Sequence, residues 1–171
     1  KIKIMIISKT PYRISLFGGG TDHPFWFNRN GGKVISFSIN KFCYITCRFL
    51  PPFFDYKYRF VYSKIETTNK INLIKHPAIK GVLKKINWNG EGLEIHHDGD
   101  LPARSGMGSS SSFTVGLLNA IINLQGKKSS KRNLAFSAID VEQRIIKETV
   151  GSQDQIAAAY GGLNCIEFYK K

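Results

Sequence analysis

The sequence of 171 residues holds no apolar run long enough to span a bilayer. Its first stretch, Lys1 to Ile7, also lacks the long apolar core and the small-residue cleavage site of a signal peptide. We therefore expect a soluble cytoplasmic protein without a membrane partner, whose first residues form a strand.

Cysteine is scarce, with three residues, and their spacing excludes the common uses of that side chain. Cys43 and Cys47 lie four positions apart in a strand-like segment, which is neither a zinc-site spacing nor a redox-pair spacing. Cys165 also lies in an apolar segment. The sequence predicts three buried thiols.

Acidic residues are few, because 12 Asp and Glu stand against 25 Lys and Arg, which gives a formal net charge of +13. A basic surface attracts nucleic acid or phosphorylated metabolites. The lysines are scattered rather than gathered in runs, which favours a lysine-rich surface with some steering of small anionic substrates. A nucleic-acid-binding module is the alternative. The aromatic and basic segment 56–62 could stack bases, although a strand with one buried face explains it more simply.

Three familiar nucleotide or nucleophile loops are missing from the sequence. The Gly-Lys pair at Gly126 has Ile121 where a Walker loop needs its first glycine, and the pair at Gly32 has Phe27 there. A dinucleotide fingerprint starting at Gly18 fails at His23, which stands where the third glycine belongs. No Gly-x-Ser-x-Gly elbow occurs.

A glycine- and serine-rich stretch, Leu101 to Phe113, is the strongest local signal that is present. It leads into apolar positions with helical spacing: Phe113, Val115, Leu117, Leu118, Ile121, Ile122 and Leu124. The first NH groups of such a helix have no partner within it and favour an anion, so the stretch predicts a phosphate-binding loop. A flexible loop before a helix capped by serine would explain the same residues.

The segment 102–112 resembles the phosphate-binding loop of the GHMP kinases, which include galactokinase, homoserine kinase and mevalonate kinase. Met107 replaces the usual leucine, and serines replace two alanines. Two further blocks, 13–22 and 151–162, match the family in the same order. Among these enzymes, the sequence most resembles bacterial sugar kinases that act on D-glycero-D-manno-heptose 7-phosphate.

The other two blocks also carry local signals. Three glycines follow a strand ending at Phe17, and the block resembles a galactokinase-type motif in which Arg13 and Asp22 take the places of the arginine and the sugar-binding aspartate. In the last block, Ser152 and Gln155 form a capping box that starts a short helix. Asp154 then falls in the first helical turn, which stabilises its ionised form.

The resemblance implies a complete set of site residues, with ATP and Mg²⁺ as cofactors and a sugar phosphate as the small-molecule partner. Asp154 would be the base and Arg13 would stabilise charge beside it. Mg²⁺ would lie on Ser110 and Glu142. The residues expected around the ATP phosphates are Pro102, Ser105, Gly106, Met107, Gly108, Ser109, Ser110 and Ser111. Those expected to contact the sugar are Gly19, Gly20, Thr21, Asp22 and Arg104.

The implied function is ATP-dependent phosphorylation of a sugar or sugar phosphate, at the anomeric hydroxyl of D-glycero-D-manno-heptose 7-phosphate in the closest match. Residues 1–171 would be the N-terminal, ATP-binding domain, with the C-terminal domain absent. A domain that binds nucleotide without turnover is therefore a further alternative.

The expected fold is α+β: a mixed or antiparallel sheet backed by helices, which by resemblance is a ribosomal-protein-like fold with a left-handed βαβ crossover. The patterns predict strands at 2–8, 13–17, 33–49, 56–62, 92–95 and 163–169, and a turn at 9–12. In 33–49 the candidate core positions are Ile35, Phe37, Ile39, Cys43, Ile45 and Cys47. Helical patterns cover 69–87, interrupted at Pro77, and segments after 108, 130 and 152; Ser129-Ser130 would cap the second of these segments and Gly161-Gly162 would end the third. His96 and His97 would point to opposite faces of a strand, which argues against a shared metal.

Overall fold

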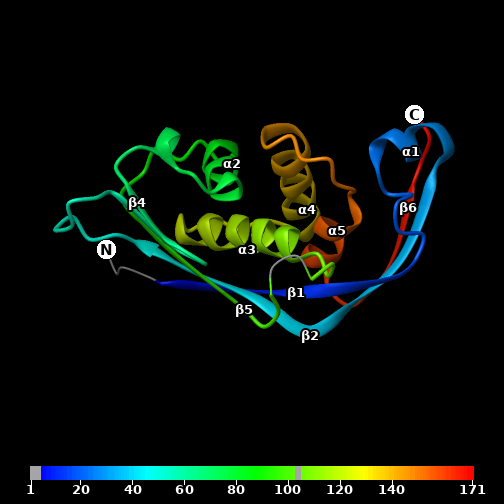
Figure 1. Cartoon of the computed structure of the whole chain (residues 1–171), viewed down its shortest axis with the longest axis horizontal. Helices are drawn as coiled ribbons and strands as arrows, with labels where there is room; N and C mark the ends of the chain where they lie inside the picture. Colours follow the sequence, from blue (N-terminus) through cyan, green and yellow to red (C-terminus); the bar gives the residue numbers. More distant parts are fainter. Residues whose placement is uncertain (1–4, 103–104) are drawn as a thin grey trace.

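The computed structural model describes residues 5–102 and 105–171, and it consists of a mixed six-stranded sheet with helices packed on one face (Figure 1). The strands are β1 (Ile6–Phe17), β2 (Gly32–Phe49), β3 (Tyr58–Val61), β4 (Ile65–Thr68), β5 (Leu93–Gly99) and β6 (Leu163–Phe168). The helices are α1 (Pro24–Asn30), α2 (Pro77–Lys85), α3 (Ser109–Leu124), α4 (Lys131–Asp140) and α5 (Gln153–Tyr160), with short turns η1 (Ile71–Leu73) and η2 (Val141–Ile145). The α+β class is confirmed.

The sheet has the strand order β1-β2-β5-β3-β4, and β6 pairs with the first half of β2. Within the described residues the one parallel pair is β3 with β5, and the chain between them forms β4 and α2. Figure 1 shows α3 lying along the sheet with α2 and α4 above it. Because α3 is enclosed in this way, it is apolar nearly all round, and Leu117, Leu118 and Ile121 are fully buried.

The predicted turn at 9–12 is wrong, because β1 continues through it as one strand. Its pairing with β2 shifts between Pro11 and Arg13, which marks a bulge. Among the described strands β1 pairs with β2 alone and so forms an edge of the sheet. An edge strand tolerates Pro11, which has no NH to donate.

The buried face of β2 changes along its length, so its core positions were predicted correctly only in the second half. Cys43, Ile45 and Cys47 are buried as expected, whereas Ile35 and Phe37 are half-buried and the buried residues there are Val34 and Ser36. The register with β1 shifts between Ser38 and Phe42, where Figure 1 shows β2 strongly bent. Each half therefore turns a different set of side chains inward.

The cysteines confirm the expected burial at two of three positions. Burial raises the pKa of both Cys43 and Cys47 to about 12, so these thiols stay protonated and inert. Cys165 is exposed on β6, which corrects the third assignment.

Two helix starts follow from local chemistry. Pro77 begins α2 rather than interrupting it, because the first helical position needs no NH donor. The Ser130 hydroxyl accepts a hydrogen bond from the Asn133 NH at 3.1 Å, which confirms the expected cap of α4. In the part of the chain that is described, no helix combines the length and apolarity needed to cross a membrane.

A buried carboxylate joins three strands on the sheet face opposite the helices. Glu94 on β5 is 2% exposed and accepts hydrogen bonds from Arg48 on β2, Arg59 on β3 and the His96 ring. Burial opposes ionisation of Glu94, but these three hydrogen bonds together outweigh it and lower its pKa. His97, which follows His96, packs edge-on against Phe113 of α3. The two histidines therefore occupy opposite faces of the sheet, as predicted.

We expect Glu94→Gln to lower the free energy of unfolding by about 1–3 kcal/mol, because two arginines lose a charged acceptor in a buried position. Since the folded pKa of Glu94 is lowered, its stabilisation is present at neutral pH and is lost as the pH falls through that pKa. Urea denaturation at pH 7 and at acid pH measures both effects. Asp98→Asn, an exposed change on the same strand face, is the control; equal effects of the two variants would contradict the role of Glu94.

Candidate active site

The loop before α3 and the first turn of that helix have the backbone geometry expected of an anion site. Gly108 ends the loop in the left-handed conformation, at φ 72°, and within the described residues no side chain caps α3. The hydroxyls of the following serines therefore do not compensate for the free NH groups of the first turn. Those groups, with the positive end of a 16-residue helix, favour a phosphate.

Arg13 and Asp154 meet beside this loop although they lie 141 positions apart. The Arg13 Nε atom donates to Asp154 Oδ1 at 2.7 Å, and Arg13 Nη1 donates to the Gly106 carbonyl oxygen at 2.9 Å. The backbone NH of Arg13 also donates to the Met107 carbonyl oxygen at 3.2 Å. One residue of β1 thus holds both the phosphate loop and the first turn of α5.

Asp154 lies against the loop itself. A Cβ atom at Gly108 would be 3.3 Å from Asp154 Oδ2, so the carboxylate borders the start of α3 directly. Burial raises the pKa of Asp154 above its usual value, with Asp22 adding to the effect, and the Arg13 guanidinium opposes it. A carboxylate with a raised pKa next to a phosphate site can accept a hydroxyl proton.

The predicted capping box at the start of α5 is wrong, although the helix does begin after Ser152. The Ser152 hydroxyl accepts from Gln143 Nε2 at 3.1 Å, and Gln155 donates to Glu142 instead of reaching back. Both side chains of the expected box therefore connect α5 to η2. Gly161 ends the helix at φ 68°, as predicted.

Glu142 is 1% exposed, on η2, and its environment suits a metal ligand. Its Oε2 atom accepts from the Ser111 hydroxyl at 2.9 Å and from Gln155, while Oε1 has no partner among the described residues. Burial raises its pKa. A buried carboxylate oxygen left without a donor is costly and fits a hard cation such as Mg²⁺. Ser111, not Ser110, contacts Glu142 directly.

A cavity of about 460 Å³ opens beside the first turn of α3. Ser109, Ser110 and Glu142 are among its polar lining residues. Its aromatic lining residues include Tyr62, His76, His97 and Phe113. The His76 ring stacks on Phe113 with centroids 4.9 Å apart, and burial lowers the pKa of both histidines, so the rings are neutral. A phosphate site joined to an aromatic cavity has the form of a nucleotide site.

Sequence reasoning missed this aromatic wall. His76 precedes a proline that starts a helix, and its Nδ1 atom accepts the Ile79 NH at 3.4 Å, but only the folded chain brings it to Phe113. Tyr62 donates to the buried Glu66 at 3.0 Å. No spacing in the sequence relates these residues to the serine loop.

The remaining site residues fall into three groups. Gly19 and Gly20 are exposed at the turn after β1, and the Thr21 hydroxyl donates to the Gly18 carbonyl at 2.7 Å. Pro102 is exposed and Ser105 is half-buried at the loop, whereas Arg104 lies outside the described residues. Asp22 is 2% exposed and is hydrogen-bonded to the start of α5.

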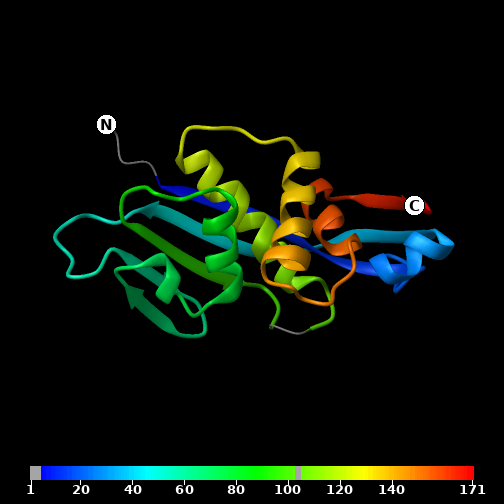
Figure 2. The same ribbon diagram turned by 90° about the horizontal axis from the view of Figure 1, so that it is seen from above.

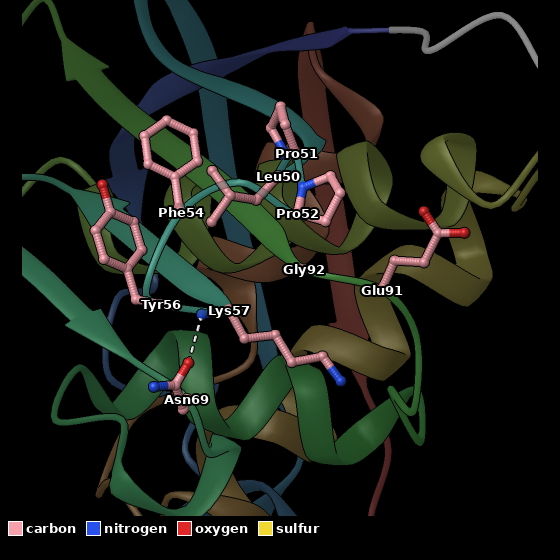
Figure 3. A pocket seen from close by; sticks show the side chains of 9 residues that line it. All are labelled: Leu50, Pro51, Pro52, Phe54, Tyr56, Lys57, Asn69, Glu91 and Gly92. Carbon is pink, nitrogen blue, oxygen red and sulfur yellow. Dashed lines mark hydrogen bonds between the residues drawn. The ribbon is translucent and has the colours of Figure 1, made fainter.

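A second hollow, of about 480 Å³, lies between the β2–β3 loop and the start of β5 (Figure 3). Phe54, Tyr56 and two prolines line it. Its amide side chain, Asn69, accepts from the Lys57 NH at 2.7 Å and donates to the Asp55 carbonyl at 3.2 Å. Asn69 therefore serves to fold the loop, and the first cavity remains the candidate site.

The order of strands and helices and the glycine- and serine-rich loop before α3 agree with one known domain family. Residues 72–162 match the family model described as the GHMP kinases N terminal domain, so the chain belongs to the GHMP kinase family.

Relatives with curated names are similar along nearly the whole chain. A D-glycero-alpha-D-manno-heptose 7-phosphate kinase from Campylobacter jejuni is 28% identical over 96% of this chain and 51% of its own length. A galactokinase from Pyrococcus furiosus is 29% identical over 91% of this chain and 44% of its own length. The chain thus spans about half the length of these relatives.

The fold agrees with solved structures. A D-glycero-D-manno-heptose 1-phosphate kinase from Bacteriodes thetaiotaomicron superimposes with a TM-score of 0.87 at 26% identity, over 98% of this chain and 57% of that protein. A mevalonate kinase from Methanococcus jannaschii, at 22% identity, shares the fold with a TM-score of 0.75.

Gly108→Ala tests the anion site. We expect a loss of about 1–3 kcal/mol in stability from the left-handed backbone, together with weaker ATP binding, because the methyl group crowds Asp154 and displaces the helix start. Gly126→Ala is the control, since Gly126 has φ 74° and open space around it. Calorimetric titration with ATP and thermal denaturation separate the effects. Equal ATP affinity in the two variants would exclude Gly108 from the site.

Proposed function

We propose that this protein transfers a phosphoryl group from ATP to a hydroxyl of a sugar or sugar phosphate. The observation that carries the proposal is the position of Asp154, which borders Gly108 at the start of α3 and is paired with Arg13. A base must stand within reach of both the hydroxyl and the transferred phosphate, and the place of Asp154 beside the start of α3 supports that role.

The chain offers a donor or charge for each part of ATP. The loop residues 105–108 and the NH groups at the start of α3 bind the phosphates. The aromatic cavity takes the adenine ring of ATP. Ser110 and Glu142 would hold Mg²⁺, with Ser111 keeping the Glu142 carboxylate in place. When bound, Mg²⁺ neutralises phosphate charge. Arg13 supplies a fixed positive charge at Asp154.

The acceptor that we propose is the anomeric hydroxyl of D-glycero-D-manno-heptose 7-phosphate. Similarity to a Campylobacter heptose 7-phosphate kinase supports it, as does a positively charged chain, which attracts a phosphorylated sugar. Gly19, Gly20 and Thr21 lie at the turn after β1, and a Cβ atom at Gly19 would be 3.8 Å from Nε2 of Gln153, the residue before Asp154. Arg104 is the proposed partner of an anionic sugar group, and the protein would act in the cytoplasm.

One set of assays separates the proposal from its competitors. ATP binding is measured with and without Mg²⁺, followed by phosphorylation of a panel containing heptose 7-phosphate, galactose and mevalonate. Turnover of heptose 7-phosphate supports the proposal in full. ATP binding without turnover of any acceptor identifies a nucleotide-binding domain that is catalytically incomplete. Salt-sensitive binding of RNA or DNA without ATP binding identifies a nucleic-acid-binding module.

For Asp154→Asn we expect kcat to fall on the order of 10²–10⁴-fold with ATP affinity retained. In the unmodified protein, kcat/KM should decline on the acid side at a higher pH than an ordinary aspartate would cause, since protonated Asp154 cannot accept a proton and its pKa is raised.

Asp140→Asn is the matched control for this variant. Asp140 has the same 25% side-chain exposure as Asp154 and also pairs with a cation, Lys85, at 2.7 Å. Its replacement should leave kcat unchanged. Full turnover by a folded Asp154→Asn protein would remove Asp154 from the role of base.

A further inference from the structure

Asp22 is buried between the glycine turn after β1 and the start of α5. Its Oδ1 atom accepts from the Gly20 NH at 3.0 Å and from Gln153 Nε2 at 3.3 Å. Its Oδ2 atom accepts from the Gln153 NH at 3.1 Å. Its backbone carbonyl accepts from the Ser152 NH at 3.1 Å. Three of these four bonds therefore join Asp22 to the residues just before Asp154.

The chain makes room for this carboxylate at one glycine. A Cβ atom at Gly151 would lie 1.8 Å from Asp22 Oδ2, so any side chain there would displace the carboxylate. Asp22 thus occupies the space of a missing side chain and takes the place of a cap on α5. Ser152 itself makes no capping bond, since its hydroxyl accepts from Gln143. A negative charge at a helix N-terminus is stabilising.

Asp154 follows Gln153 directly, so whatever fixes Gln153 fixes the direction of Asp154. Burial and three charged or titratable groups shift the pKa of Asp154: burial and Asp22 raise it, while Arg13 from β1 and His23 from the loop lower it. Arg13 holds the Asp154 carboxylate from the side of the strand, and Asp22 holds the backbone of the turn that carries it. The site needs both restraints, because general-base geometry tolerates little displacement.

We propose that Asp22 is a positioning residue for Asp154, acting through the first turn of α5, and does not contact the sugar. The proposal rests on the proposed function of Asp154 as the base. Both oxygens of the Asp22 carboxylate already accept hydrogen bonds from the protein, and the residue is 2% exposed. A sugar hydroxyl would have to break those bonds to reach it.

Kinetics of Asp22→Asn distinguish positioning from sugar contact. The amide can still accept at Oδ1, but its NH₂ group would face the Gln153 NH, donor against donor. We expect kcat to fall about tenfold to a hundredfold, with the KM for the sugar within about twofold. The acid limb of the pH profile should also move to lower pH, because a negative charge near Asp154 is gone. A large rise in KM at unchanged kcat would overturn the proposal.

A second measurement does not depend on catalysis. The carboxyl carbon of Asp154 is titrated by NMR in the full chain without substrate, in the unmodified and Asp22→Asn proteins. The variant should show a lower Asp154 pKa and faster exchange of the Gln153 amide. If no acceptor is phosphorylated by the unmodified protein, the proposed function fails while this titration still decides the structural link. The same Asp154 pKa in both proteins would contradict the link between Asp22 and Asp154.

Two further variants keep the test decisive. If Asp22→Asn does not fold, Gln153→Ala removes only the side-chain bond to Asp22, and it should lower kcat severalfold at constant KM. Lys131→Met is the control, since it removes the bond from Lys131 to the Tyr160 carbonyl, at the opposite end of α5. It should leave kcat unchanged. An equal loss of kcat in Lys131→Met would show that the loss of any contact of α5 lowers kcat, and would overturn the specific role of Asp22.

Discussion

The ion pair between Arg13 and Asp154 is the contact on which the arrangement of the site depends. It joins an edge strand to a helix 141 positions away, and the same guanidinium reaches the phosphate loop at Gly106. Because both charges are largely buried, the pair is costly unless its geometry is held from several sides. The bulged strand β1, the start of α3 and the first turn of α5 supply those restraints.

Acidic residues are few in this chain, and at the candidate site Asp22 and Glu142 are buried while Asp154 is half-buried. All three lie around the starts of α3 and α5, while the excess lysine charge is spread over the surface. Burial raises the pKa of both Glu142 and Asp154. A basic exterior around a few largely buried carboxylates suits anionic ligands, since the surface attracts them.

Local patterns predicted the elements well where one physical cause dominates. The apolar spacing after the serine loop gave α3, Ser130 gave the cap of α4, and paired glycines gave the end of α5. Predictions failed where a partner distant in sequence overrides local preference. Gln155 binds Glu142 instead of closing a capping box, and the bend in β2 reverses which side chains face inward. Cys165 is exposed because its side chain lies on the face of β6 opposite to that of the buried Ile166.

The sequence by itself determined the glycine- and serine-rich loop before α3, the order of the three family blocks and the first-turn position of Asp154, because each depends on residues close together in the chain. Only the tertiary structure decided what those residues touch. It brought Arg13 to Asp154, turned Asp22 into the interior, and assembled the aromatic cavity from the turn after β3, the start of α2, β5 and α3. Such contacts depend on sheet register and helix packing, which no local spacing encodes.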